Sequence, residues 1–106
     1  MALDLDERPR LQRDLGSKNL MLLRNHGTLT VGKSCAQAFL RMYFLERSCT
    51  MQVRTRMLGG EDYPTADAVI EKNAELARGG GFENVSKLAW PALLRKLDRM
   101  DRSFRD

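Results

Sequence analysis

The sequence predicts a mixed α/β fold in which a β-hairpin is followed by long helices. Three stretches carry this prediction. Strand-forming residues flank a short turn within residues 19–31, and apolar residues recur every three or four positions over 35–57 and again over 85–100. The chain has 106 residues, of which 42% are hydrophobic and 30% charged, so one globular domain with a buried core is expected.

Residues 19–31 predict an antiparallel hairpin. The first strand, at 19–25, has four consecutive apolar residues, which is typical of a strand covered on both faces. A helix is the competing interpretation, but the run is short and lies between glycines. The second strand, at 28–31, alternates polar and apolar β-formers. Only His26 and Gly27 separate the strands, and Gly27 is free to adopt a positive φ.

A long helix is predicted at 35–57. Gly32 interrupts the second strand, and Ser34 is a favourable N-cap for the helix. Further apolar residues widen the helix surface beyond one stripe, so we expect a second helix or another subunit to cover it. The buried stripe is expected to contain Cys35, Ala38, Phe39, Met42, Leu45, Cys49 and Val53.

A shorter helix is predicted before the hairpin. Asp4 or Asp6 is a suitable cap, Pro9 suits the first turn, and Gly16 is expected to end the helix.

Two helices are predicted after the long one. Thr65 is a suitable cap for a helix at 66–77. The glycines at 79–81 follow a helix, which favours a flexible linker or C-cap over a phosphate cradle. Pro91 suits the first turn of a helix at 90–100, and the polar tail after it is expected to be loose.

The charge distribution argues against a nucleic-acid footprint. The net charge is +4, and the excess lies in residues 33–58 and 87–106. The basic residues are dispersed among apolar ones and lack interleaved surface aromatics, which favours a solvated or subunit-facing helix surface. A small basic nucleic-acid binder is the last-ranked alternative, and no nucleic-acid partner is predicted.

The cysteines and the apolar runs indicate a cytoplasmic protein. Cys35 and Cys49 are about 21 Å apart on one helix, beyond the reach of a disulfide. Residues 1–10 carry five charges and do not resemble a signal peptide. No segment approaches the roughly 20 apolar residues of a membrane span.

His26 is the chain's single histidine and its only candidate metal ligand. A metal site needs three or four ligands, so a lone histidine at a turn is more often structural. A catalytic pair of His26 with Cys35 is an alternative, although helix packing already explains Cys35. The sequence contains no serine elbow, P-loop or dinucleotide fingerprint, and catalytic residues are left unassigned.

The hairpin and the helix after it resemble the class II aldolase/adducin family. The resemblance covers roughly residues 3–58 and is carried by Leu22–Gly32, which contains Asn-His-Gly, and by the helix segments 36–39 and 43–46. Residues 89–98 resemble the tail of a bacterial subgroup. The resemblance implies part of a three-layer α/β/α domain, with a core at 1–58 and a helical C-terminal extension at 59–106.

The resemblance also implies a chemistry. The family includes metal-dependent aldolases that cleave sugar phosphates, a ribulose-phosphate 4-epimerase, dehydratases and the non-enzymatic adducin head. In its enzymes the histidine matching His26 is a zinc ligand, two more ligands come from an upstream His-x-His segment, and an acidic residue upstream assists. The zinc would act as a Lewis acid on a carbonyl substrate.

Two expectations for function follow from the resemblance. In one, these residues are a fragment of a metal-dependent lyase or epimerase for a small sugar phosphate or related carbonyl compound. The upstream half is absent, so the chain alone is expected to be inactive. In the other, the chain is an adducin-like interaction module. Family members of this kind are usually tetramers, so a homo-oligomer is expected.

Overall fold

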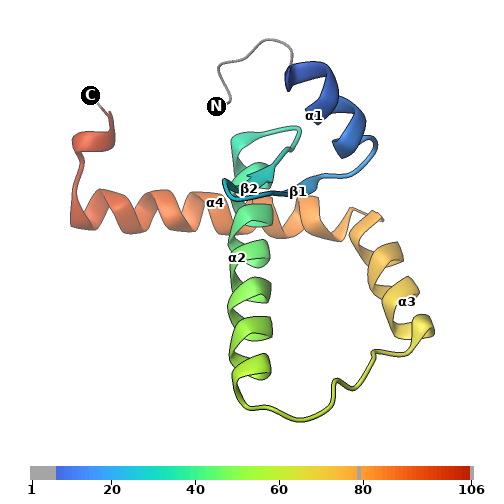
Figure 1. Cartoon of the computed structure of the whole chain (residues 1–106). Coiled ribbons are helices and arrows are strands. Elements are labelled where there is room, and N and C mark those ends of the chain that lie inside the picture. Colours follow the sequence, from blue (N-terminus) through green and yellow to red (C-terminus); the bar gives the residue numbers. More distant parts are fainter. Residues whose placement is uncertain (1–6, 79, 106) are drawn as a thin grey trace. The chain divides into compact units, whose positions relative to one another are not determined.

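The computed structural model describes residues 7–78 and 80–105, so the Asp4 and Asp6 caps predicted for the first helix lie outside the described residues. The chain divides into two compact units, Met1–Cys49 and Thr50–Asp106. The fold is mixed α/β with a hairpin followed by long helices, as predicted. The elements are α1 (Glu7–Leu15), β1 (Leu20–Leu23), β2 (Gly27–Thr30), α2 (Cys35–Met57), α3 (Asp67–Arg78), α4 (Gly81–Met100) and the 3₁₀ turn η1 (Ser103–Arg105) (Figure 1).

Helix α1 ends where the sequence predicts. Gly16 has φ +52° and donates its N–H to the carbonyl of Gln12 at 3.0 Å. Glycine adopts this left-handed conformation without steric cost, which explains why the helix stops there.

Strands β1 and β2 form an antiparallel hairpin, as predicted. Leu20 pairs with Thr30 and Leu23 with Gly27. Among the described residues the sheet has two strands, so these residues supply no further strand against β1. Leu22 is 66% exposed, and the cover expected on both faces of β1 is therefore not provided by the described residues.

Helix α2 begins and ends at the predicted residues, but its buried positions differ from the prediction. Leu40 and Gln37 are its buried residues, each 7% exposed, whereas Phe39 and Val53 of the predicted stripe are 45% and 58% exposed. Gln37 is not among the residues of the predicted stripe, and glutamine is a residue type that is mostly exposed. It is buried because it packs beneath the backbone of Gly32 at the entry to the helix.

Helix α4 is longer than predicted. It begins at Gly81, ten residues before Pro91, so the prediction of a helix starting near residue 90 is wrong. Proline removes one backbone hydrogen bond from a helix interior. The helix continues through it because apolar residues recur at helical spacing on both sides of the proline, and α4 packs against α3 within the second unit. Gly80, with φ +84°, forms the N-cap of α4 rather than part of a flexible linker.

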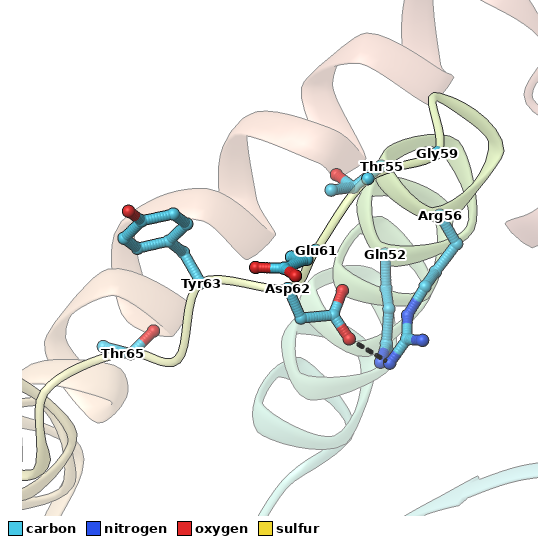
Figure 2. Close-up of a pocket in the computed structure, with 9 residues that line it drawn as sticks. Gln52, Thr55, Arg56, Gly59, Glu61, Asp62, Tyr63 and Thr65 are labelled. Atoms are coloured by element: carbon cyan, nitrogen blue, oxygen red, sulfur yellow. Dashed lines mark ion pairs between the residues drawn. The ribbon is translucent and has the colours of Figure 1, made fainter.

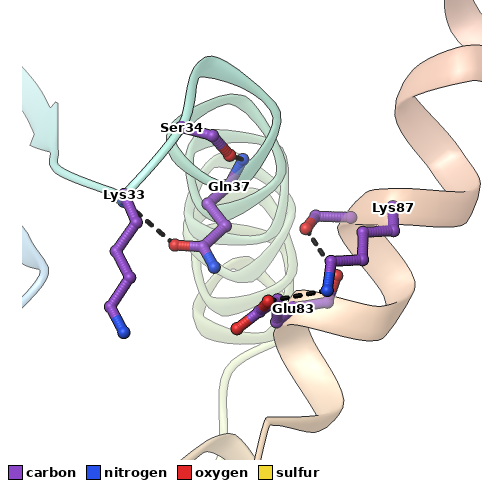
Figure 3. A network of polar contacts seen from close by, with 6 residues as sticks. Lys33, Ser34, Gln37, Glu83 and Lys87 are labelled. Atoms are coloured by element: carbon purple, nitrogen blue, oxygen red, sulfur yellow. Dashed lines mark hydrogen bonds and ion pairs between the residues drawn. The ribbon is translucent and has the colours of Figure 1, made fainter.

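The C-terminal segment is folded back on α4, in contrast to the loose tail predicted. Arg105 pairs with Asp98 at 2.7 Å, and the Asp101 carboxylate accepts hydrogen bonds from the Ser103 N–H and hydroxyl, both at 2.9 Å. These two hydrogen bonds hold the pKa of Asp101 below its usual value. Earlier in α4, Lys87 forms an exposed ion pair with Glu83 at 2.7 Å (Figure 3).

None of the described helices is long and apolar enough to cross a lipid bilayer.

Candidate functional site

The turn between β1 and β2 presents His26. The N–H of His26 donates to the carbonyl of Leu23 at 3.2 Å, which closes a four-residue β-turn. The third residue of this turn, Asn25, has φ +55°. Asparagine tolerates the left-handed region better than other non-glycine residues, so the Asn-His order suits this turn. The imidazole of His26 is exposed.

Gly27 adopts a positive φ, as predicted, although it lies in β2 and not between the strands. Gly27 has φ +153°, and it pairs with Leu23 as the first residue of β2. Asn25 is therefore the turn residue with a left-handed backbone, and Gly27 adds a second positive φ at the start of β2.

Two threonines of β2 contact α2. The Thr28 hydroxyl lies 3.0 Å from Oε1 of Glu46 and 3.1 Å from Sδ of Met42. The Thr30 hydroxyl donates to the carbonyl of Ala38 at 2.9 Å. Thr28 and Thr30 point to the same face of the hairpin because side chains alternate along a strand. This face of β2 is therefore attached to one stripe of α2.

The junction between β2 and α2 is fixed by a capping arrangement. The Ser34 hydroxyl accepts a hydrogen bond from the Gln37 N–H at 3.3 Å, as predicted for an N-cap (Figure 3). The Gln37 side chain accepts one from the Lys33 N–H at 3.0 Å. This resembles a capping box, except that the returned bond reaches the residue before the cap. Nearby, Arg41 donates to the carbonyl of Val31.

The donors among the described residues do not complete a metal site. No group of three or more His, Cys, Asp or Glu side chains is close enough to hold an ion within the part of the chain that the structure describes. A structural or catalytic zinc needs at least three protein donors. Cys35 is exposed and Cys49 half-buried, and both are free thiols. With His26 as a single imidazole donor, the described residues alone do not fit a zinc ion.

The second unit contains a hollow of ≈ 550 Å³ that no motif in the sequence predicts (Figure 2). It forms where the loop after α2 turns back toward the end of that helix. Arg56 and Asp62 form an ion pair across it at 2.6 Å, with side chains 65% and 56% exposed. An ion pair this exposed contributes little stability. The hollow is lined by Gln52, Thr55, Arg56, Gly59, Gly60, Glu61, Asp62, Tyr63 and Thr65.

The Thr28–Glu46 contact was also missed from sequence. The two residues are 18 positions apart, and neither is unusual in composition or spacing. In the sequence, Glu46 stands out only as part of segment 43–46, which resembles the family. Its contact follows from the way β2 folds back on α2, which no local pattern in the sequence shows.

The fold matches part of a solved structure from the aldolase II superfamily. A crystal structure of an aldolase II superfamily protein from Pseudomonas syringae matches this chain with a TM-score of 0.83 and 40% sequence identity. The match covers 98% of this chain and 42% of that chain. This likeness confirms the predicted fold class.

The sequence comparisons give the family. Residues 2–53 match the family described as "Class II Aldolase and Adducin N-terminal domain". A "Putative aldolase class 2 protein" of Caulobacter vibrioides is 42% identical over 106 residues, covering 100% of this chain and 41% of the relative. Rat alpha-adducin is 40% identical over 64 residues, covering 58% of this chain and 9% of adducin. The chain belongs to the class II aldolase and adducin family, as the resemblance predicted.

The bacterial relatives are much longer than this chain. A second relative of the same description, from Pseudomonas aeruginosa, is 39% identical over 108 residues, and the matched part makes up 42% of its length. The chain thus spans about two fifths of the bacterial relatives that it matches.

Proposed function

We propose that these residues form part of a metal-dependent lyase or epimerase that acts on a small sugar phosphate or related carbonyl compound. His26 supplies one ligand to the metal, and the remaining ligands come from outside the described residues. The divalent metal, zinc by family resemblance, supplies Lewis-acid chemistry when the site is complete. His26 binds the ion through a neutral imidazole nitrogen.

The observation that supports this proposal is the exposed imidazole at an ordered turn. The His26 N–H is bonded to Leu23, Asn25 supplies the left-handed residue, and β2 is attached to α2 two residues later. A ligand held by its backbone in this way loses little conformational freedom when it binds an ion. The same turn lies in a segment that matches the family.

A non-enzymatic, adducin-like module is the second candidate. It is favoured by the similarity to alpha-adducin over 64 residues and by the incomplete donor set among the described residues. In this alternative the hairpin and α2 serve assembly, and His26 has a structural role in the turn.

The test is made on the polypeptide encoded by the whole reading frame around residues 1–106. The lyase or epimerase predicts a His-x-His pair encoded ahead of Met1 and about one equivalent of metal per chain, lost in His26→Ala. Asn84→Ala, an exposed change in the second unit, is the control and should keep the metal. A reading frame without such a pair, and a purified protein without metal, would support the adducin-like module instead.

We also propose that the chain forms homo-oligomers, with a tetramer expected from family resemblance. Tyr43 and Phe44 on α2 are 51% and 47% exposed, and their rings lie edge to face at 5.6 Å. Light scattering at micromolar concentration should therefore give a mass above that of one chain. Tyr43→Glu should shift the equilibrium toward monomer, because association would bury the new charge.

Arg47→Ala is the matched control for the association experiment, since Arg47 is exposed on the same helix and polar already. It should leave the mass unchanged. A stable monomer for the unmodified chain at micromolar concentration would contradict the proposal.

A further inference from the structure

We propose that Thr28 and Glu46 are positioning residues that hold the His26 turn in place relative to α2. This inference rests on the proposed function in one respect, namely that His26 is a metal ligand. The contact itself is observed in the structure. The hydroxyl of Thr28, which lies on β2 two residues after His26, is 3.0 Å from the carboxylate of Glu46 on α2.

The Thr28 hydroxyl has two acceptors within reach but one hydrogen to donate. Oε1 of Glu46 lies at 3.0 Å and Sδ of Met42 at 3.1 Å. A carboxylate is a much stronger acceptor than a thioether, so the hydrogen bond goes to Glu46. Met42 then provides a packing contact beneath the same hydroxyl. The bond to a charged acceptor is the stronger kind of side-chain hydrogen bond.

The polar contacts show that β2 and α2 run in opposite directions along each other. Thr30 contacts the carbonyl of Ala38, and Thr28 contacts Met42 and Glu46. Two strand residues advance about 6.8 Å and the four helix residues from Ala38 to Met42 about 6 Å, so these two spacings match. Glu46 lies one turn farther along α2, and its longer side chain reaches back to Thr28, in the direction that helix side chains lean. Thr28 is thus the contact residue on the His26 side of the strand, and Glu46 is its partner farthest along α2.

The hairpin's own bonds are a weak restraint on the turn. His26 donates to Leu23 at 3.2 Å, and Leu23 pairs with Gly27. A two-stranded hairpin is marginally stable by itself. The described residues add no third strand beside it. Attachment of Thr28 to α2 therefore prevents the end of the hairpin that carries His26 from fraying.

The experiment measures amide hydrogen exchange by NMR on the whole chain. Two probes report on opposite ends of the hairpin: the His26 N–H, bonded to Leu23, and the Val31 N–H, bonded to Asn19 at 3.0 Å. Thr28→Val keeps the shape of the side chain and removes the hydroxyl. It should lower the protection of His26 about fivefold, as expected for one lost hydrogen bond. Protection of Val31 should change less than twofold.

Conservative variants separate positioning from a general effect on stability. Thr28→Ser keeps the hydroxyl donor, and Glu46→Gln keeps an oxygen acceptor. In both variants the protection of the His26 N–H should stay within twofold of that in the original chain. Glu46→Ala should lower His26 protection at least as much as Thr28→Val, and the double variant should lose less than the sum of the two single losses, because both variants remove the same bond. Glu46 is exposed, so its variants are expected to fold even if Thr28→Val does not.

Equal losses of protection at His26 and Val31 would overturn the proposal, because they indicate only a less stable hairpin. Unchanged protection in Thr28→Val and Glu46→Ala would overturn it as well. The measurement needs no metal and no substrate. The positioning proposal can therefore be overturned independently of the proposed metal role, because the metal role is tested by the metal content of His26→Ala.

Discussion

Gly32→Ala is expected to lower the free energy of unfolding of the first unit by about 2 kcal/mol, within the range for overpacking a closely packed site. A Cβ at this position would lie 2.8 Å from the backbone N of Ala38 and 2.9 Å from Cβ of Gln37. Both atoms belong to the first turn of α2, so the strand–helix junction would have to open. The gain from restricting the unfolded chain, about 0.4–1 kcal/mol, is too small to compensate.

Denaturant unfolding followed by NMR signals from β1 and β2 would measure this effect. Lys33→Ala is the matched control, because Lys33 is exposed and its bond to Gln37 uses the backbone N–H. That variant should stay within about 0.5 kcal/mol of the original. Equal stability of Gly32→Ala and Lys33→Ala would show that the junction is not tightly packed.

Pro91→Ala is expected to raise the free energy of unfolding of the second unit by about 2 kcal/mol. Proline in a helix interior is about 3 kcal/mol less favourable than alanine. Part of this gain is offset because proline also restricts the unfolded chain. In α4 an alanine N–H at position 91 can donate to the carbonyl of Lys87, one turn earlier. The ring of Pro91 is exposed, so little packing is lost with it.

The fluorescence of Trp90, the single tryptophan, reports the unfolding of α4 directly. Pro91→Gly restores the same N–H and should stabilise the unit by about 1 kcal/mol less than Pro91→Ala, because glycine is a poorer helix former. If Pro91→Ala instead lowers stability, the proline ring contributes packing that outweighs the missing hydrogen bond.

The first half of the fold could be predicted because local signals and tertiary structure agree there. Ser34 is a strong N-cap, and the apolar spacing after it is helical, so the bounds of α2 at Cys35 and Met57 were predicted correctly. The hairpin was predicted from a short continuous apolar run and a run of alternating β-formers on either side of His26 and Gly27. These features depend on residues close in sequence.

The features that local sequence patterns do not predict depend on residues brought together by folding. Proline is a local signal for a helix start, but α4 passes through Pro91 because the packing of the helix outweighs the local preference. Gln37 belongs to a residue type that is mostly exposed, yet the approach of Gly32 to the first turn of α2 buries it. Composition and periodicity contain no information about such an approach.

The candidate site also has one part that the sequence predicts and another that only the structure shows. His26 was identifiable because it is the single histidine and lies in an Asn-His-Gly turn. Its attachment through Thr28 and Glu46 depends on a contact across 18 residues, which only the structure provides. The hollow beside Arg56 likewise depends on the path of the loop after α2.

A zinc titration of the 106-residue chain tests the central claim most directly, namely that His26 is a ligand whose partners lie outside these residues. Isothermal calorimetry should give no stoichiometric, tight binding, because a single imidazole cannot hold the ion. One equivalent of tightly bound zinc that disappears in His26→Ala would contradict the claim, since it would require a complete site within the chain.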